Sequence, residues 1–580
     1  MKEEIRPLTF GTLNFLHTTD THGWYLGHTN QRQYSSDWGD FLSFHLNLKN
    51  LINNKQHGDL LLVDTGDRHD GNGLSDMTSP NGQLSNEIFL MADYDLVTVG
   101  NHELYRADVS TLEYETTVKY YGERFISTNV EYLNDSNKWV VFGNSTHRYF
   151  KTEINNYTIL ALSFMFDFHL GNERVRVKPI DELIYEHWFI NLLKKYQKQP
   201  VDALVIFGHM PVTKDWKEFI VLHNFLRSFF PSTQIQYFGG HSHIRDFSIL
   251  DNKATGLQSG RYCETVGFLS IQNLQYNESV HSNVFRRYID FNLHSFTNHT
   301  GFYNLEDFNT EKGLFTSKEV GKYSNNLGLD EVYGYVPQNY YIAAADYINK
   351  DERSLLRFLE DEILIQLEPK ICDEKNGQLY QRSNNSRVII INTGGVRYDL
   401  YKGEFTKNAL FTVSPFKNMW RVIPSVDKTI ALRLKAILNE GQIILSESQL
   451  QLKSPYQNAI NLMIETNKIQ SSLKEKSSLS YGYNTIDDFG ADGDDTVHKA
   501  LQFHYVPNVI QSYEEGSTDK IDVVFYDFIE PFIFNALLKA CDNNENLFAE
   551  LSSTTRFYND CAYESNVGEL LKRYAQSKWN

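Results

Sequence analysis

Aspartate, asparagine and histidine residues recur directly after short apolar runs in the first half of the chain. Seven of them make up two carboxylates, one amide and four imidazoles: Asp20, His22, Asp67, Asn101, His209, His241 and His243. This mixture of nitrogen and oxygen ligands suits two borderline divalent ions such as Zn, Mn, Fe or Co, and it suits neither Ca nor an iron–sulfur cluster. The set therefore predicts a dinuclear metal centre.

Such a centre has a defined chemistry. Two metal ions about 3.5–4 Å apart can hold the attacking and leaving oxygens of a phosphoryl displacement, and they need a bridging anion such as a carboxylate. Because bound water ionises near neutral pH, a metal-bound hydroxide is the expected nucleophile. A single histidine more often has a packing role. The metal interpretation therefore depends on the whole set of seven residues, which occur in order along the chain after successive apolar runs.

The elements that must position these side chains are short strands. The apolar runs are separated by helix-like amphipathic stretches, and they are Leu13–Leu16, Leu60–Val63, Leu96–Val99, Ala203–Phe207 and Ile235–Phe238. This alternation is typical of an α/β domain, whose sites lie just beyond the carboxyl ends of strands. Asp20 and His22 are two residues apart, so on an extended segment both side chains would point the same way.

The length and composition of the chain limit its domains and partners. A length of 580 residues favours two large domains. We expect one over residues 1–305, a polar linker over 306–335 and a second domain over 336–580. A net charge of −18 disfavours long nucleic acids and anionic membrane surfaces as partners. No apolar run approaches the roughly 18 residues of a membrane span.

The ordered motifs resemble those of the calcineurin-like metallophosphoesterases. They are D-T-H (Asp20–His22), G-D (Gly66–Asp67), G-N-H-E (Gly100–Glu103), G-H (Gly208–His209) and G-H-S-H (Gly240–His243). Within that superfamily, Leu16–Gly23 and Val63–Asp67 are similar to the 5′-nucleotidases, and the chain resembles a divergent, fungal-type, two-domain member. The resemblance implies a four-layer α/β/β/α sandwich followed by an α+β substrate-binding domain.

The resemblance also implies roles for single residues. One metal would be held by Asp20, His22, Asp67 and His243, and the other by Asp67, Asn101, His209 and His241, with Asp67 as the bridge. His102 would act catalytically beside the phosphate. The family usually has an aspartate where this chain has Tyr105, and that aspartate orients the histidine. Its loss would lower the pKa of His102 and shift the optimum to acid pH, unless Asp108 substitutes.

Two motifs of the second half are similar to the 5′-nucleotidase C-terminal domain. They are Asn392–Arg397 and Ser414–Asn418, similar to N-G-G-G-I/V-R and P-F-G-N, and they imply the substrate contacts Asn392, Gly395, Arg397, Phe416 and Asn418. Arg397 could pair with a phosphate or carboxylate, and Phe416 could stack on a base. The family's second stacking aromatic falls at Thr496 here, unless Tyr481, Tyr483 or Phe489 replaces it.

The function expected from these features is hydrolysis of a nucleotide or a similar small phosphoester by two divalent metal ions. An alternative on the same metals is a nucleotide phosphodiesterase or a sugar-nucleotide pyrophosphatase. An alternative of another class is a binding or cell-surface protein that retains the metals but has little turnover. The family resemblance favours a secreted or vacuolar location with a leader absent from this chain, and the sequence leaves a cytoplasmic location and the oligomeric state open.

Overall fold

The computed structural model describes residues 5–274, 283–368, 370–372, 379–381, 384–416, 418–440, 493–496, 504–558 and 566–579. The chain divides into two compact units. Unit 1 comprises Met1–Leu327 and Lys468–Leu501, and unit 2 comprises Gly328–Asn467 and Gln502–Asn580. Each unit has its own sheets and its own apolar core.

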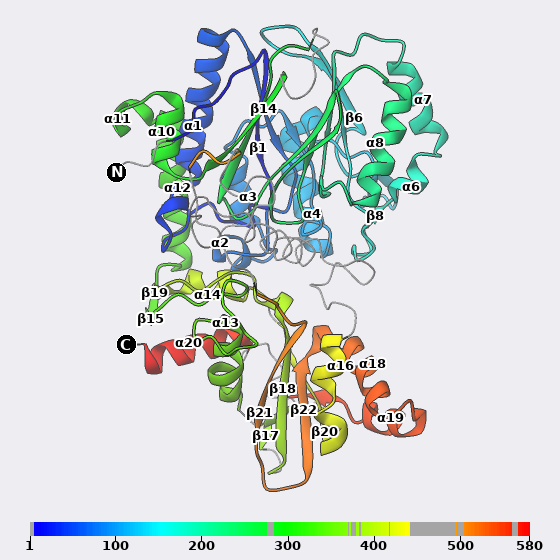
Figure 1. Ribbon diagram of the computed structural model, residues 1–580, viewed down its shortest axis with the longest axis vertical. Coiled ribbons are helices and arrows are strands. Elements are labelled where there is room, and N and C mark those ends of the chain that lie inside the picture. The colour runs from blue at the N-terminus through cyan, green and yellow to red at the C-terminus, as the bar shows by residue number, and fades with distance from the viewer. Residues whose placement is uncertain are drawn as a thin grey trace, which may run out of the picture. The chain divides into compact units, whose positions relative to one another are not determined.

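Two mixed sheets form the centre of unit 1 (Figure 1). The first has the order β14-β13-β1-β2-β3, with β1 (Leu13–Thr18), β2 (Asp59–Asp64), β3 (Leu96–Val97), β13 (Thr265–Ile271) and β14 (Val284–Asp290). The second has the order β11-β12-β10-β9-β7-β6, with β6 (His147–Lys151), β7 (Thr158–Ser163), β9 (Ala203–Phe207), β10 (Gln234–Gly239), β11 (Arg245–Asp251) and β12 (Ala254–Ser259). Because β1, β2 and β3 are parallel, and β7, β9, β10 and β12 are parallel, their carboxyl ends share an edge within each sheet.

The two sheets pack face to face. Side chains from both, such as Phe15 and Val63 on one and Ala161 and Val205 on the other, form one buried core. Leu62 points to the opposite face and is also buried, which is why the strands read as continuous apolar runs. Helices lie outside both sheets: α1 (Trp38–Leu51), α10 (Leu293–Thr300) and α12 (Glu311–Leu327) on one side, and α6 (Ile180–Leu183), α7 (His187–Tyr196) and α8 (Lys217–Phe229) on the other (Figure 1). The expected four-layer sandwich is confirmed.

Unit 1 also contains a small third sheet and several shorter helices. A separate antiparallel sheet has the order β5-β4-β8, with β4 (Val130–Leu133), β5 (Trp139–Val141) and β8 (Val175–Val177). The remaining helices are α2 (Gly73–Asp76), α3 (Gln83–Phe89), α4 (Ala107–Glu113), α5 (Lys119–Tyr121) and α11 (Leu305–Phe308).

Part of the expected linker is helical and packs within unit 1. α12 covers most of it and contacts α1. The two helices approach closely because each carries a glycine at the contact: a β-carbon on Gly39 would lie 2.3 Å from the carbonyl oxygen of Gly313. The sequence around α12 reads as polar because much of this helix faces solvent, whereas Val320 is buried.

Unit 2 is built on a five-stranded sheet with the order β21-β18-β22-β20-β23. Its strands are β18 (Ser386–Asn392), β20 (Trp420–Asp427), β21 (Val509–Glu514), β22 (Lys520–Tyr526) and β23 (Arg556–Phe557). Two further sheets have two strands each: β15 (Val332–Val336) pairs with β19 (Gly403–Thr406), and β16 (Lys370–Cys372) pairs with β17 (Leu379–Gln381). The helices are α13 (Leu355–Phe358), α14 (Lys407–Val413), α15 (Lys428–Ala431), α16 (Leu434–Glu440), α18 (Glu530–Ala540), α19 (Glu545–Ser552) and α20 (Val567–Lys578). The second domain is thus α+β, as expected.

Residues Gly493–Thr496 belong to unit 1, although in the sequence they lie between β20 and β21 of unit 2. Asp494 pairs with Tyr288 of β14 through the backbone, and its carboxylate lies 2.8 Å from a guanidinium nitrogen of Arg245. Thr496 donates to Asp290 at 2.5 Å. Contacts with Arg245 and Asp290 thus hold this segment in unit 1, whereas Arg397 and Phe416 lie in unit 2. The equivalence of Thr496 with the family's second stacking aromatic stays a prediction. Tyr481, Tyr483 and Phe489 lie outside the described residues.

Candidate metal centre

Loops that follow the parallel strands of both sheets of unit 1 bring the predicted ligands together. His209 Nε2, after β9, lies 2.9 Å from Asp67 Oδ2, after β2. His243 Nε2, after β10, lies 3.2 Å from Asp20 Oδ1, after β1, and 3.1 Å from His22 Nε2. Residues from four strand ends thus meet in one buried cluster.

The cluster consists of two groups that share one carboxylate. Ligand atoms of Asp20, His22, Asp67 and His243 lie within 4.8 Å of one another, and so do those of Asp67, His209 and His241. The two carboxylates and the rings of His22 and His209 are buried, whereas His241 and His243 are partly exposed. Burying this many ionisable groups is costly unless a cation or protons compensate their charges.

The amide of Asn101 provides a separate test of whether a cation fits. Its side chain is 1% exposed, and its nitrogen donates to the Tyr105 hydroxyl at 3.0 Å. That bond fixes the amide, and Oδ1 is buried without a hydrogen-bond partner among the described residues. A buried acceptor left unpaired costs about 1–3 kcal/mol. An oxygen held in this way beside carboxylates and imidazoles fits a metal ligand.

Backbone carbonyls set the tautomers of two imidazoles. His22 Nδ1 lies 2.5 Å from the carbonyl oxygen of His69, and His209 Nδ1 lies 2.8 Å from that of Thr65. A carbonyl only accepts, so each Nδ1 carries a proton, and in the neutral ring Nε2 is the nitrogen whose lone pair faces the cluster. These contacts orient both rings as metal ligands require.

Five of the candidate ligand residues have a left-handed backbone conformation. Positive φ angles of 45° to 76° occur at Asp20, His22, Asp67, His241 and His243. Non-glycine residues rarely adopt this conformation, and it concentrates at functional sites. β1 ends at Thr18, so the extended segment expected to align Asp20 and His22 does not exist. Tight turns after the strands align them instead.

Glu103 holds together the loop after β2 and the loop after β3 through hydrogen bonds. The sequence did not reveal this role, although Glu103 lies in the G-N-H-E motif. Its fully buried carboxylate accepts hydrogen bonds from the backbone nitrogens of Asp67 (3.0 Å), Arg68 (2.7 Å) and Gly100 (2.7 Å). Gly100 permits this approach, because a β-carbon there would lie 2.1 Å from Asp67 Oδ1.

His102 has a carboxylate partner that was not expected. Its Nδ1 lies 2.8 Å from Asp70 Oδ2, in the loop after β2, and its Nε2 lies 3.9 Å from Asp67 Oδ2. Asp108 is exposed and pairs with Arg106, so the suggestion that it substitutes is wrong. Because Asp70 supplies the carboxylate that position 105 lacks, the stated reason for an acid-shifted optimum no longer applies.

The charges of the cluster strongly influence one another. Burial alone would favour the neutral form of Asp67, but His209 and His102 outweigh it and hold the pKa of Asp67 well below its ordinary value. Burial likewise opposes protonation of His209, yet Asp67 and Asp20 raise its pKa to about 9. Burial, helped by His209, lowers the pKa of His241 to about 3. The carboxylates thus concentrate positive charge on His209.

Unit 2 brings together most of the expected substrate contacts. Asn392 ends β18, and the turn Thr393–Gly395 follows it. The guanidinium carbon of Arg397 lies 5.7 Å from the ring centroid of Phe416. Buried Asn392 Oδ1 and Arg397 Nε and Nη2 have no hydrogen-bond partner among the described residues. Asn418 is half-buried.

Comparison with known proteins defines the class. Residues 13–245 match the calcineurin-like phosphoesterase family, and residues 339–534 match the C-terminal domain of NAD nucleotidases. The chain belongs to the calcineurin-like phosphoesterases of the 5′-nucleotidase type, and it is a metal-dependent phosphoester hydrolase.

Individual relatives extend over nearly the whole chain. The crystal structure of a 5′-nucleotidase from Candida albicans is 42% identical and has a TM-score of 0.85, and the match covers 99% of this chain and 100% of that one. An uncharacterised protein of Saccharomyces cerevisiae is 41% identical over 98% of this chain and 94% of its own length. A secreted protein of Arthroderma benhamiae is 34% identical over 90% of this chain and 85% of its own length.

Proposed function

We propose that this protein releases orthophosphate from nucleotides with two divalent metal ions bound in unit 1. The observation that carries the proposal is the buried ligand cluster in which two groups share Asp67. The similarity to the 5′-nucleotidase of Candida albicans supports a nucleotide as the substrate. The proposed reaction is attack of water on the phosphorus atom of the nucleotide with departure of the ester oxygen.

The residues of the cluster divide between the two ions. Asp20, His22, Asp67 and His243 would hold one, and Asp67, Asn101, His209 and His241 the other, with Asp67 between them. The neutral amide of Asn101 limits the negative charge around the second ion. When bound, Zn, Mn, Fe or Co would supply Lewis acidity toward the phosphate oxygens and lower the pKa of water.

His102 would assist departure of the ester oxygen. Asp70 holds its Nδ1 at 2.8 Å, which directs Nε2 toward the cluster. A histidine in this position can stabilise the charge that develops on the phosphate or donate a proton to the leaving oxygen. His102 and Asp67 would therefore be the catalytic residues of the chain itself.

Unit 2 would recognise the nucleoside. Phe416 offers an aromatic face and Arg397 offers guanidinium donors without a partner among the described residues. A base can stack on the ring, and its carbonyl or ribose oxygens can accept from the guanidinium. Asn392, Gly395 and Asn418 would complete this recognition site.

The match to the C-terminal domain of NAD nucleotidases favours a second candidate substrate class. A dinucleotide or sugar nucleotide contains a phosphoanhydride, and the same two ions could cleave it. The non-catalytic alternative finds no comparable support, because the chain belongs to a family of hydrolases.

A substrate panel tests the proposal. Full-length protein is freed of metal, reloaded with Mn²⁺, Zn²⁺ or Co²⁺, and assayed for products from AMP, cyclic AMP, NAD and UDP-glucose. We expect metal-dependent orthophosphate release from AMP, with loss of at least 1,000-fold in Asp67→Asn and no change in Asp108→Asn, an exposed aspartate outside the cluster. Cleavage of NAD or UDP-glucose alone would favour the second candidate, and no turnover of any substrate would refute both.

A secreted or vacuolar location is also proposed. The support is the relative named as a secreted protein. No helix of the described residues has the length and apolarity to cross a membrane. Exposed Asn144 begins the sequon Asn-Ser-Thr. Protein from the native host should therefore shift in mobility after endoglycosidase treatment, and an unshifted protein in the cytosolic fraction would contradict the proposal.

A further inference from the structure

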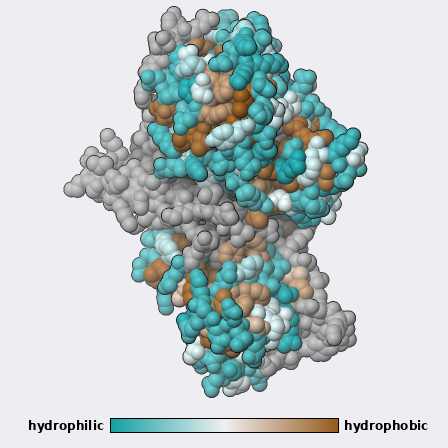
Figure 2. Space-filling view, turned by 90° about the vertical axis from the view of Figure 1, so that its right-hand side faces the viewer, coloured by the Kyte–Doolittle hydropathy of each residue, from teal (hydrophilic) through white to brown (hydrophobic). Residues whose placement is uncertain are grey.

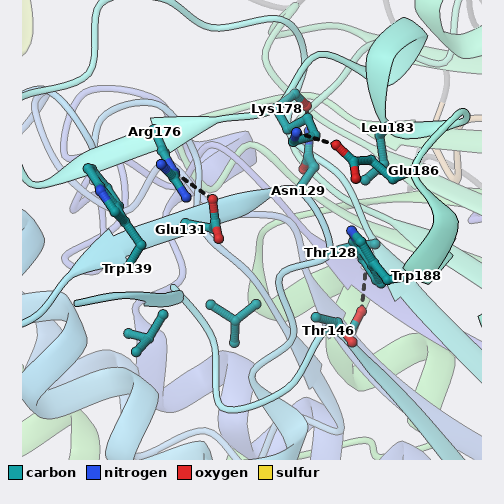
Figure 3. A pocket seen from close by; sticks show the side chains of 12 residues that line it. Thr128, Asn129, Glu131, Trp139, Thr146, Arg176, Lys178, Leu183, Glu186 and Trp188 are labelled. Carbon is teal, nitrogen blue, oxygen red and sulfur yellow. Dashed lines mark hydrogen bonds and ion pairs between the residues drawn. The ribbon is translucent and has the colours of Figure 1, made fainter.

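A cavity of about 550 Å³ lies in unit 1 among residues that take no part in the metal centre (Figure 3). The sheet β5-β4-β8 and the segment that carries α6 and α7 contribute its walls. Pockets that bind small molecules have volumes of about 300–1,000 Å³. The cavity is therefore large enough for a ligand of several rings.

Two tryptophans face this cavity from different elements. Trp139 begins β5 and Trp188 lies in the first turn of α7, and Figure 3 shows them on opposite sides of the pocket. They remain 37% and 40% exposed. Figure 2 looks onto the side of the molecule that carries α6 and α7, where apolar patches interrupt a mostly hydrophilic surface. The guanidinium carbon of Arg176 lies 4.3 Å from the ring centroid of Trp139 and covers one face of that ring, so a ligand can stack only on the opposite face. Solvent-accessible indole rings in a concave site are suited to binding rather than to packing.

Two ion pairs supply the polar part of the pocket. Arg176 Nε lies 2.6 Å from Glu131 Oε2, and Lys178 Nζ lies 2.5 Å from Glu186 Oε1. These four side chains are 36% to 51% exposed. A guanidinium carries five N–H donors and a carboxylate accepts several hydrogen bonds, so each pair retains free capacity. The pocket thus offers donors and acceptors together with almost no net charge.

The charge balance decides the class of ligand. A phosphate favours cations without a bound carboxylate, and here each cation already has one at hydrogen-bond distance. A metal ion favours carboxylates that are not neutralised by Arg or Lys. Sugar hydroxyls both donate and accept, and the C–H face of a pyranose packs against an indole ring. We propose that this pocket binds a neutral oligosaccharide, with Trp139 and Trp188 as stacking platforms and the two ion pairs as hydroxyl partners.

Saturation-transfer NMR on the full chain tests this proposal with maltose, cellobiose, lactose, mannobiose and N,N′-diacetylchitobiose as probes. We expect at least one disaccharide to bind, and Trp139→Ala and Trp188→Ala each to weaken it tenfold or more. Glu131→Gln, which conserves shape, should weaken it several-fold. Tyr185→Ala is the matched control, because Tyr185 is 76% exposed between α6 and α7 but does not line the cavity. Phosphate release should be unchanged in all four variants.

Three results would overturn the proposal. The first is that none of the disaccharides binds. The second is that a disaccharide still binds after both tryptophan substitutions. The third is that AMP or adenosine binds, that this binding is lost in the tryptophan variants, and that the sugars do not compete with it. Circular dichroism establishes that each variant is folded, and Glu131→Gln tests the site without removing an aromatic ring. Because phosphate release is read separately, failure of the sugar site leaves the proposed hydrolase function standing.

Discussion

At the scale of single residues, the partners of His102 and Asn101 have been rearranged relative to the family pattern. Asp70, in the loop after β2, approaches His102, whereas Tyr105 binds the amide of Asn101. One tyrosine thus orients a candidate metal ligand, and a carboxylate from another loop orients the candidate acid. Asp70 therefore supplies the carboxylate beside His102 that the family's aspartate would supply.

Replacing Asp70 tests this arrangement. Asp70→Asn keeps the size of the side chain but removes its charge, so His102 should be less well oriented and a proton on it less stabilised. We expect kcat for the preferred nucleotide to fall roughly 10- to 100-fold with KM changed less than about threefold. Steady-state kinetics provide the measurement. Asp108→Asn is the control, and an equal loss in both variants, or an effect on KM alone, would contradict the role of Asp70.

The raised pKa of His209 predicts how metal affinity depends on pH. With a pKa of about 9, His209 is protonated at pH 7, and a metal ion must displace that proton to reach Nε2. Affinity for Mn²⁺ should therefore fall by roughly tenfold for each pH unit below about 9. Proton release on adding Mn²⁺ to the metal-free protein in weak buffer measures this, and His209→Gln should release about one proton fewer. Equal release from both proteins would refute the prediction.

At the scale of elements, the centre depends on loops rather than on the strands themselves. The strands end before the ligands, and left-handed turns then direct the ligand side chains into one space. Glu103 ties the backbone after β2 to that after β3. A single buried carboxylate therefore holds two loops together that each carry a candidate ligand.

Glu103→Gln should destabilise unit 1. Glutamine has nearly the same shape, but it carries no charge and cannot satisfy all three backbone donors. We expect a loss of about 2–4 kcal/mol in the free energy of unfolding, since hydrogen bonds to charged groups contribute about 1.5–3 kcal/mol each. Urea unfolding measures it. Glu115→Gln, on the exposed surface of the following helical segment, should change stability by less than about 1 kcal/mol, and comparable losses in the two variants would sink the prediction.

At the scale of the whole molecule, chemistry and recognition are assigned to different units. Arg397 and Phe416 belong to unit 2, whereas every candidate metal ligand belongs to unit 1. If this division is correct, substitutions in unit 2 affect substrates according to whether they contain a nucleoside. A small phosphoester without a base should be insensitive to them.

Arg397→Ala separates the two roles. We expect KM for AMP to rise about tenfold or more, with kcat within about threefold, because a charged hydrogen bond contributes about 1.5–3 kcal/mol. Hydrolysis of p-nitrophenyl phosphate should be unchanged. Arg353→Ala is the control, since Arg353 is half exposed and paired with Asp351. A parallel loss on both substrates would indicate damage to unit 1 or to folding, and it would refute the assignment.

Much of this protein follows from local sequence. The apolar runs predicted the strands, and the polar residues after each run predicted the ligands, because parallel strands necessarily place their carboxyl ends on one edge of a sheet. The order and types of the motifs were sufficient to indicate the superfamily. These features depend on short-range pattern, which a single sequence displays directly.

Only the tertiary structure decided which side chains are in contact with one another. The partnership of Asp70 with His102, the three backbone contacts of Glu103 and the return of Gly493–Thr496 to unit 1 join segments that are remote or unrelated in pattern. So does the pocket between Trp139 and Trp188, whose two indole rings come from β5 and from α7. Such contacts depend on how loops and sheets pack in three dimensions, and no local periodicity encodes that packing.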